Sequence, residues 1–405
     1  MSLNNKKILF LPFAPIFSKD SHSKNFLNLI KHIGPEIKNN NYTAVIISYN
    51  NTTLEKNENI IKISNAPYLN LYKIRILKRF FPSGKVLFQV LEYIFNFIKT
   101  TLYIIIDRPD IIYAYGAKPL YLTFPLKIIF RFKLIFDMRG DILDEQKVRG
   151  ASKRKLSILS KINTSAVNSV DLAFSISSSY NINSKTKFIP KYNYYDGEIF
   201  RYDEAQMLKK KKELKLEDKF IFVYTGNTHY YQFLDGTVKF FSQFLGKHNN
   251  SFFIIITEHD SSKFVNLLNE YNVPETSYLI KSLPQNEISD LQQIADIGFL
   301  LRENLPLNHH SFPTKFAEYL ATGVPVLMTP HIYTIAPIVM ENNLGEVINI
   351  KNDYSAEIDK IYPKYKSNIS IKNHCSQFAR AELMWQNKAK FIMNIITEKS
   401  LDKGL

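Results

Sequence analysis

Apolar residues along the chain gather in short continuous runs, and polar segments with helical spacing lie between them. Continuous runs are typical of strands in a parallel sheet that is buried on both faces. In the first half they are Lys7–Pro12, Tyr42–Tyr49, Ile60–Ile63, Ile111–Tyr115, Leu134–Asp137 and Asp171–Ser177. In the second half they are Phe220–Tyr224, Ser251–Thr257, Ile297–Leu301, Pro325–Met328 and Leu344–Ile350. Helical patterns alternate with them at Asn25–Ile37, Asp203–Asp218, Glu287–Ala295, Thr314–Ala321 and Phe378–Ile396. The alternation predicts an α/β protein with doubly wound sheets.

One helical run, Val86–Ile106, is more apolar than a helix with a single sheet-facing side requires. Its polar residues form one narrow stripe made of Gln89, Glu92, Asn96 and Lys99. Basic residues precede the run, namely Lys73, Arg75, Lys78 and Arg79. Three interpretations remain: docking at a membrane interface, burial inside the domain, and a membrane span. We prefer docking, because Glu92 and Lys99 argue against a span. The strongly charged run Asp203–Asp218 is interpreted as a solvated connector between domains.

Composition narrows the class of partner. The chain has 405 residues, which is enough for two domains with their own cores. A net charge of +15 favours an anionic partner such as nucleotide phosphates, lipid headgroups or nucleic acid. A single cysteine, Cys375, excludes a disulfide framework and a multi-cysteine zinc site. No signal peptide is expected, because the run after Lys6 and Lys7 already breaks at Pro12.

The segment Ser311–Thr329 carries the strongest candidate chemistry. A turn at Pro313 leads into a helix with Lys315 in its first turn and Glu318 one turn later. A helix N-terminus offers unpaired N–H groups and a positive dipole end, which suit a diphosphate. Glu318 could accept hydrogen bonds from two neighbouring hydroxyls. The alternative is that Lys315 and Glu318 form a solvated ion pair.

The preceding segment adds a second cation. The apolar run Ile297–Leu301 stops at Arg302, where a guanidinium could bind phosphate with two hydrogen bonds. The alternative is an arginine that satisfies local carbonyls. His309 and His310 could touch a sugar or a phosphate, or could be ordinary loop residues. They do not predict a metal site, because no clustered carboxylate or cysteine partners lie nearby in the sequence.

The order of loop, helix, Gly323-Val-Pro-Val and strand resembles the donor-binding signature of bacterial glycosyltransferase family 4, the glycosyl transferases group 1. The resemblance implies the GT-B fold: two Rossmann-like doubly wound domains that face a cleft, with a C-terminal helix returning to the first domain. We expect the boundaries at 1–198 for the acceptor-side domain, 199–376 for the nucleotide-sugar domain and 377–405 for the returning helix.

The resemblance also implies roles for particular residues. The loop Thr225–Thr228 is similar to the first loop of the family's donor domain, and Asp137–Glu145 is similar to a segment at the interdomain cleft. Implied catalytic residues are Arg139, Arg302 and Lys315. Implied donor-binding residues are Gly226, Asn227, Ser282, Leu283, Arg302, Ser311, Thr314, Lys315 and Glu318. Implied acceptor-side residues are Asp20, His22 and Asp141, of which Asp20 and His22 could instead cap the next helix.

One departure from the family is visible after Gly226. Many members carry an arginine and a lysine there, whereas this chain has Tyr230, Tyr231 and Gln232. Arg302 and Lys315 would then supply the missing charge.

The implied activity is that of a retaining glycosyltransferase of the hexosyl or N-acetylhexosaminyl type. It would move a sugar from a nucleoside diphosphate sugar to a lipid-linked or oligosaccharide acceptor in lipopolysaccharide, O-antigen or capsule biosynthesis. No metal and no other cofactor would be required. The protein would be cytoplasmic and peripherally attached to the anionic inner face of the membrane.

Two alternatives belong to other classes. A nucleotide-sugar epimerase of the same fold would have no need of the apolar, basic segment. A nucleic-acid binder would explain the charge but neither Glu318 nor the Gly323-Val-Pro-Val pattern, so we expect no nucleic-acid partner.

Overall fold

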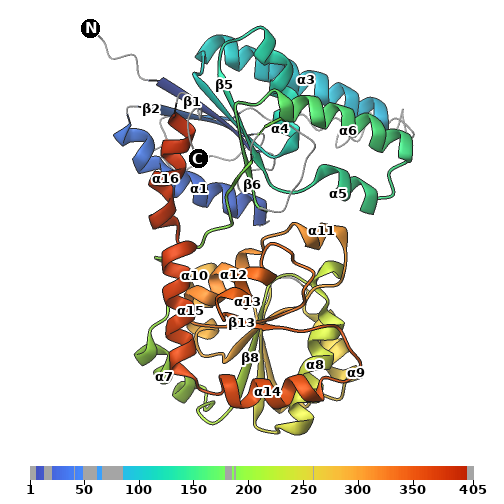
Figure 1. Cartoon of the computed structure of the whole chain (residues 1–405), viewed down its shortest axis with the longest axis vertical. Coiled ribbons are helices and arrows are strands. Elements are labelled where there is room, and N and C mark those ends of the chain that lie inside the picture. Colours follow the sequence, from blue (N-terminus) through green and yellow to red (C-terminus); the bar gives the residue numbers. More distant parts are fainter. Residues whose placement is uncertain are drawn as a thin grey trace. The chain divides into compact units, whose positions relative to one another are not determined.

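The computed structural model describes residues 6–12, 21–40, 42–48, 62–65, 85–177, 185–186, 188–258 and 260–398. The chain divides into two compact units. Unit 1 is Met1–Lys191 with Ala389–Leu405, and unit 2 is Tyr192–Lys388. Each unit is a parallel sheet with helices packed on it (Figure 1). The basic residues that precede the apolar helix, Lys73, Arg75, Lys78 and Arg79, lie outside the described residues.

The sheet of unit 1 has seven strands among the described residues, all paired in parallel. They are β1 (Lys6–Pro12), β2 (Tyr42–Ser48), β3 (Lys62–Asn65), β4 (Ile111–Tyr115), β5 (Lys133–Met138), β6 (Leu172–Ser175) and β7 (Phe188–Pro190). Their order is β3-β2-β1-β4-β5-β6-β7, so the chain winds outward from β1 in both directions. The doubly wound α/β prediction is confirmed. The strand β7 is not among the expected runs, because three residues ending in proline give a weak pattern.

Helices of unit 1 cover this sheet. They are α1 (Ser21–Asn39), α3 (Lys85–Asp107), α4 (Ala117–Thr123), η2 (Phe124–Ile128), α5 (Ile142–Val148) and α6 (Lys153–Asn168). The last helix, α16 (Trp385–Thr397), starts in unit 2 and continues into unit 1 from Ala389. The Lys133 ammonium donates to the carbonyls of Ile395 and Ile396 at 3.3 and 2.9 Å. These bonds attach the end of α16 to the β5 strand.

The sheet of unit 2 has six strands among the described residues, again all parallel. They are β8 (Phe220–Thr225), β9 (Ser251–Ile256), β10 (Tyr278–Lys281), β11 (Ile297–Leu300), β12 (Val326–Met328) and β13 (Gly345–Val347). The helical segments are α7 (Glu204–Glu213), η3 (Tyr230–Gln232), α8 (Leu234–Lys247), α9 (Ser262–Glu270), η4 (Glu275–Ser277), α10 (Gln285–Gln292), α11 (Pro306–His309), α12 (Thr314–Ala321), α13 (Ala336–Glu341), α14 (Ser355–Tyr365) and α15 (Ile369–Glu382).

The winding of this second sheet determines where a ligand can bind. The order is β10-β9-β8-β11-β12-β13, so the chain runs outward from β8 on one side and returns at β11 on the other. Where the direction of winding reverses, the loops after the two central strands diverge and leave a crevice at the carboxyl edge. Thr225 ends β8 and Leu300 ends β11. The loops that follow these two residues therefore flank the crevice.

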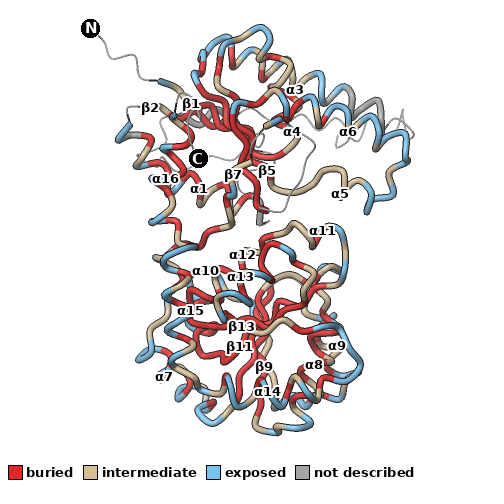
Figure 2. The backbone as a smooth tube through the Cα atoms, viewed as in Figure 1, coloured by how far each residue is buried: buried red, intermediate tan, exposed pale blue. Residues whose placement is uncertain are grey.

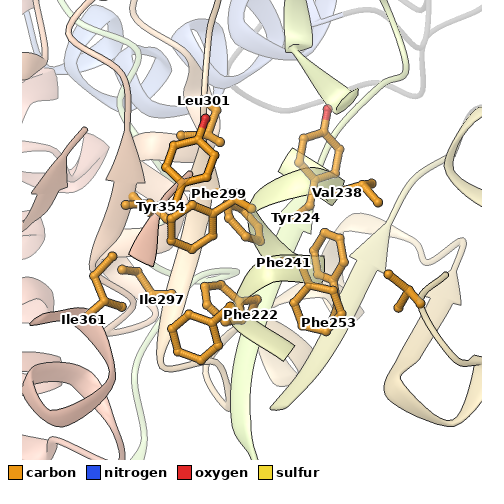
Figure 3. Close-up of a cluster of buried hydrophobic side chains, with 14 of the residues drawn as sticks. Phe222, Tyr224, Val238, Phe241, Phe253, Ile297, Phe299, Leu301, Tyr354 and Ile361 are labelled. Carbon is orange, nitrogen blue, oxygen red and sulfur yellow. The ribbon is translucent and has the colours of Figure 1, made fainter. Parts of the chain in front are cut away.

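Phenylalanine side chains fill the core of unit 2. Figure 3 shows Phe222 among Phe241, Phe253 and Phe299. The ring of Phe222 stacks on Phe299 at 4.9 Å between centroids and meets Phe244 edge-on at 4.7 Å. Such pairs add to the free energy gained from burial. Part of the phenylalanine content of the chain thus supports the sheet of unit 2.

The charged run in α7 differs from its prediction. The helix lies in unit 2 and is shorter than expected, ending at Glu213, so the connector interpretation of Asp203–Asp218 is wrong. Its face is not wholly solvated either. Lys211 is buried, with its ammonium 3.6 Å from the Asp296 carboxylate, and Asp296 also accepts the backbone N–H of Ile221 at 2.8 Å. An acceptor buried in the sheet draws one lysine of the run inward.

In helix α3, Asn96 of the predicted polar stripe is buried and Lys99 is half-buried, while the side chains of Gln89 and Glu92 are not described. Thr100 is also buried, whereas many apolar side chains of the helix are exposed. Figure 2 colours the exposed stretches of α3 pale blue. The exposed apolar side chains are Leu91, Tyr93, Ile94, Ile98, Leu102, Ile105 and Ile106. The interpretation that this helix fills the domain core is therefore wrong. Within the part of the chain that the structure describes, no helix is long and apolar enough to cross a membrane.

The core packing makes a direct prediction. Phe222→Ala should lower the unfolding free energy by about 3–5 kcal/mol, because it leaves a cavity among large rings. The matched control is Phe391→Ala on α16, where the side chain is 56% exposed and the loss should stay within about 0.5 kcal/mol. Urea unfolding of both variants measures the difference. Equal losses would contradict the assignment of Phe222 to the centre of the core.

Candidate functional site

Three elements of unit 2 bring polar groups to the crevice. Gly226 follows β8, Arg302 follows β11, and Lys315 lies in the first turn of α12. Gly226 has φ +139°, and a Cβ added there would lie 3.0 Å from the Lys315 ammonium. Only glycine both adopts this backbone conformation readily and leaves room for the ammonium. The structure therefore brings together two of the residues that the sequence predicted, from segments far apart in the chain.

The ammonium of Lys315 is held by neutral groups. It lies 4.0 Å from the centre of the Tyr224 ring and 3.2 Å from the Oε1 of Gln232. An aromatic face attracts a cation through its quadrupole, most strongly where water is excluded. The Tyr224 hydroxyl donates to the carbonyl of Asn227 at 2.6 Å, which fixes the ring beneath the loop. Burial raises the pKa of Tyr224, so its hydroxyl stays neutral.

The guanidinium of Arg302 reaches the same acceptor. Its Nη1 donates to the Oε1 of Gln232, and its centre lies 5.8 Å from the ring of Tyr231. Its backbone is fixed by Thr329 after β12. The Arg302 N–H donates to the Thr329 hydroxyl at 2.9 Å, and that hydroxyl donates to the Arg302 carbonyl at 2.6 Å. The alternative interpretation was that the guanidinium satisfies local carbonyls. Among the described residues, the guanidinium instead bonds to the side chain of Gln232.

These two cations are buried without a matching anion. Arg302 is 3% exposed and Lys315 is 6% exposed. Among the described residues, neither forms an ion pair with a carboxylate. Burial, and then the charge of Arg302, hold the pKa of Lys315 well below its ordinary value, while Glu318 acts in the opposite direction. Burial also lowers the pKa of Arg302. Buried charges without partners are costly, so this arrangement suits an anionic ligand.

The N-terminus of α12 contributes backbone donors beside the cations. The residue before the helix is Pro313, and no side chain caps the first turn. The loop that leads into the helix is fixed by the ring of Tyr192, which stacks on Phe312 at 4.6 Å, and by Asn193, which donates to the Phe312 carbonyl at 2.5 Å. A helix start that is held in place without a side-chain cap can offer its N–H groups to an anion.

Other predicted donor-binding residues lie in the loop after β8, in the loop before α12 and in α12 itself. Ser311 and Thr314 are half-buried, and the Ser311 hydroxyl donates to the carbonyl of Asn308 at 2.9 Å. Glu318 is half-buried one turn after Lys315. The side chain of Asn227 accepts from the N–H of His229 at 3.2 Å, which shapes the loop after β8.

Ser282 and Leu283 follow β10 at the same carboxyl edge of the sheet, two strands away from β8. Ser282 is exposed and Leu283 is half-buried.

The two histidines differ from the cations in their surroundings. His309 stacks on Tyr333 at 4.4 Å, and its Nε2 lies 2.7 Å from the Oδ1 of Asn304. His310 is half-buried. Within the described ranges, no group of three or more His, Cys, Asp or Glu side chains is arranged to hold a metal ion.

In unit 1, the predicted residue Arg139 lies in a buried network with a carboxylate, unlike the two cations of unit 2. The Arg139 guanidinium is buried 3.5 Å from the Asp137 carboxylate and 5.0 Å from the Tyr115 ring. Asp137 also accepts from the Lys191 ammonium at 2.8 Å and from the Tyr113 hydroxyl at 2.6 Å. Burial lowers the pKa of Lys191 to about 8, although Asp137 opposes the shift. Arg139 therefore belongs to a buried network at the carboxyl end of β5.

The acceptor-side residues are placed only in part. The Asp141 carboxylate caps α5 by accepting from the N–H of Leu143 at 2.7 Å, and this residue is half-buried. Asp20 lies outside the described residues. His22 lies in α1, but its side chain is not described.

Gln232 was not predicted as a site residue. It stood out in the sequence only as a departure from the arginine and lysine that many family members carry. The structure places its amide oxygen between Arg302 and Lys315. The signal in the sequence was the lack of an arginine or lysine after Gly226. Another polar side chain of this loop was then to be expected near Arg302 and Lys315.

Comparison with known proteins agrees with this architecture. Residues 206–380 match the family model described as "Glycosyl transferases group 1". No curated protein has a sequence that matches the chain. Among solved structures, HepE of Anabaena in complex with UDP has a TM-score of 0.69 at 12% identity, covering 96% of this chain and 99% of that one.

Two further structures are similar over the same extent. Sucrose-phosphate synthase of Thermosynechococcus elongatus has a TM-score of 0.66 at 13% identity, covering 96% of this chain and 98% of that one. WaaG, a glycosyltransferase involved in lipopolysaccharide biosynthesis, has a TM-score of 0.66 at 10% identity, covering 96% and 99%. The chain thus has the GT-B fold, and its residues 206–380 match the Glycosyl transferases group 1 family.

Proposed function

We propose that the protein is a retaining glycosyltransferase that moves a sugar from a nucleoside diphosphate sugar to a glycan acceptor. The observation that carries this proposal is the pair of buried cations, Arg302 and Lys315, beside the uncapped start of α12. A diphosphate supplies the negative charge that this site lacks. The matched family and the UDP bound to HepE support the same class of ligand.

The chemistry follows from where charge develops during transfer. As the bond between the sugar and the diphosphate breaks, negative charge grows on the leaving phosphate oxygens. Preorganised donors aimed at those oxygens stabilise the transition state more than the ground state. Arg302, Lys315 and the N–H groups of α12 would supply them, and Gly226 lets the backbone approach closely. Because these cations can neutralise the diphosphate, we propose that no metal is required.

The remaining donor contacts are assigned by position. Glu318, one turn beyond Lys315, would accept hydrogen bonds from the ribose hydroxyls. Ser282 and Leu283, after β10, would meet the nucleobase with backbone groups. Ser311 and Thr314 would line the phosphate and sugar side. The other solved complexes of HepE contain UDP with glucose and UDP-glucose, so uridine is the first base to test.

The acceptor side is proposed for unit 1. In this proposal Asp20, His22 and Asp141 face the acceptor and Arg139 assists from the β5 end. The acceptor would be a lipid-linked or oligosaccharide glycan, and the product a bacterial surface polysaccharide such as lipopolysaccharide, O-antigen or capsule. The similarity to WaaG, which acts in lipopolysaccharide biosynthesis, motivates this choice.

An anionic membrane surface is the proposed partner of unit 1. Exposed apolar side chains of α3 include Ile98 and Leu102, and α6 adds Ile158 and Ile162. The helix α4 joins them, since the Tyr93 hydroxyl donates to the Tyr121 carbonyl and the Tyr121 hydroxyl donates to Asn163, both at 2.9 Å. Exposed basic residues on α6 are Lys153, Arg154, Lys155 and Lys161. Apolar and basic side chains together are what a helix at a charged membrane surface requires. The protein would then work at the inner face of the cell membrane.

The activity itself is tested by following diphosphate release. Purified protein is incubated with UDP-sugars and other nucleoside diphosphate sugars, with and without a glycan-lipid acceptor, in the presence of EDTA. Release that depends on the acceptor, survives EDTA and gives a product of retained anomeric configuration supports the proposal. Conversion of the donor sugar without an acceptor would instead identify an epimerase.

Each of the two cations should contribute strongly to the rate of sugar transfer. Lys315→Ala and Arg302→Ala should each reduce kcat/KM by about 30- to 900-fold, equivalent to about 2–4 kcal/mol of transition-state stabilisation. The control is Lys364→Ala, since the Lys364 side chain is 45% exposed and pairs with Glu346 at 2.6 Å, outside the crevice. Unchanged kinetics in either crevice variant would refute the phosphate assignment.

Glu318 is testable separately from the cations. Glu318→Gln should weaken UDP binding by about fivefold, or about 1 kcal/mol, because an ionised acceptor becomes a weaker neutral one. Inorganic pyrophosphate, which has no ribose, should bind this variant as tightly as wild type or more tightly. Calorimetry with both ligands checks the assignment. A variant that binds UDP as tightly as wild type would rule out the ribose contact.

The membrane proposal predicts salt-sensitive sedimentation with anionic vesicles. Wild type should pellet at low salt and be released at high salt, since each basic residue near the surface contributes about 1 kcal/mol. A double variant, Ile98→Ser with Leu102→Ser, should stay in the supernatant. Ile350→Ser, at an exposed position of unit 2, is the matched control and should behave as wild type. Wild type in the supernatant at low salt would end the membrane proposal but leave the transferase proposal intact.

A further inference from the structure

The segment after Gly226 contributes an amide to the crevice. Gln232 is buried at the end of η3, and both ends of its side chain are engaged. Its Oε1 accepts from Lys315 at 3.2 Å and from the Nη1 of Arg302. Its Nε2 donates to the Oδ1 of Asn227 at 3.0 Å. One neutral side chain therefore links the loop after β8 to both cations.

The orientation of this amide is determined by its neighbours. An amide oxygen accepts and an amide nitrogen donates, so two cations on one side and the Asn227 oxygen on the other allow one orientation only. The backbone is held as well. Phe233, the next residue, has φ 49° and ψ 54°, a left-handed conformation that is uncommon outside glycine. Its ring occupies the place that a Cβ at Gly236 would need. Residues in sparsely populated backbone conformations are enriched at functional sites.

Both the position and the neutrality of the Gln232 amide oxygen matter. Donors from Arg302 and Lys315 converge on a single acceptor atom, which is where an anionic oxygen would receive the strongest field. A carboxylate there would neutralise the cations and leave little attraction for a ligand. An amide accepts the same hydrogen bonds while it leaves the net positive charge in place.

We propose that Gln232 is a positioning residue, whose amide oxygen acts as a neutral substitute for a phosphate oxygen and keeps Arg302 and Lys315 converged before the diphosphate binds. The inference deepens the proposed function and rests on the same crevice. Without the amide, the two like charges would separate, and the ligand would have to bring them together at the expense of its own affinity.

The proton on Lys315 provides an independent readout. The charged and titratable groups that face this lysine are Arg302 after β11, Glu318 on α12 and Tyr224 on β8. Because the pKa of Lys315 is held low, its positive charge is present below that pKa and lost as the pH rises through it. Pyrophosphate affinity should therefore decline with rising pH, earlier than it would for an exposed lysine. A carboxylate at position 232 would raise this pKa and move the decline to higher pH.

The test compares Gln232→Glu with Gln232→Met, which has nearly the same shape but no strong acceptor. Binding of inorganic pyrophosphate and of UDP is measured by calorimetry across pH, and the melting temperature of each free protein is recorded. Gln232→Glu should melt at or above the wild-type temperature, since it pairs two buried cations, yet bind pyrophosphate at least about tenfold more weakly. Gln232→Met should melt lower and bind about three- to tenfold more weakly, with the pH dependence of wild type.

A buried glutamine elsewhere in unit 2 supplies the control. Gln293 is buried, and its Oε1 accepts the N–H of Asp203 at 3.1 Å. Gln293→Met should lower the melting temperature without changing pyrophosphate affinity. If Gln232→Glu binds pyrophosphate as tightly as wild type, or if its affinity declines at the same pH, the positioning role is overturned.

The same measurements distinguish a failure of this inference from a failure of the proposed function. Wild type that binds pyrophosphate, with Gln232→Glu impaired, but that transfers no sugar would preserve this inference and remove the transferase. Wild type that transfers sugar, with pyrophosphate binding unimpaired in Gln232→Glu, would preserve the transferase and overturn this inference. Wild type that binds no pyrophosphate would overturn both.

Discussion

The burial of two cations without a carboxylate partner is the constraint on which the rest of unit 2 depends. Arg302 and Lys315 lie at the carboxyl edge of the sheet, and their desolvation opposes folding. The surrounding structure has to supply that free energy. It does so with a sheet buried on both faces and with the phenylalanine cluster around Phe222 (Figure 3). The rigidity of that core is also what allows two like charges to remain close together.

Elsewhere in the described residues, buried cations lie beside a carboxylate, except for Lys372, which donates to the backbone carbonyls of Gln293 and Ala295. In unit 1, Asp137 lies 2.8 Å from Lys191 and 3.5 Å from Arg139. In unit 2, Asp296 lies 3.6 Å from Lys211. Both aspartates are fully buried and serve structure. The crevice differs because two buried cations, Arg302 and Lys315, converge on one neutral acceptor, the amide of Gln232, with no carboxylate at ion-pair distance among the described residues. Two like charges that converge on a neutral group are better explained by a ligand than by folding.

The parts of this picture that could be predicted are local in sequence. The helix Thr314–Ala321 has the bounds expected from its pattern. The placement of Arg302 after a strand and of Lys315 at a helix start was also predicted, because a strand end and a helix start are recognisable within a few residues. Gln232 could not be found in this way, since its partners are 70 and 83 residues away. The side of α3 that is buried could not be predicted from the sequence either. A narrow polar stripe indicates the solvent side of a helix, whereas Asn96 of this stripe is buried.

The groups that hold Lys315 share one property, which connects the fold to the chemistry. The ring of Tyr224 and the amide of Gln232 are both neutral and polarised, and both place negative potential at the ammonium. Neutral partners of this kind stabilise a buried cation in part, and they do not cancel its field beyond the first contact. In the proposed transfer, a diphosphate would therefore meet charge that has been positioned but not neutralised. The charge that grows on its leaving oxygens as the bond to the sugar breaks would meet the same field, so the features that favour binding would favour the transition state still more.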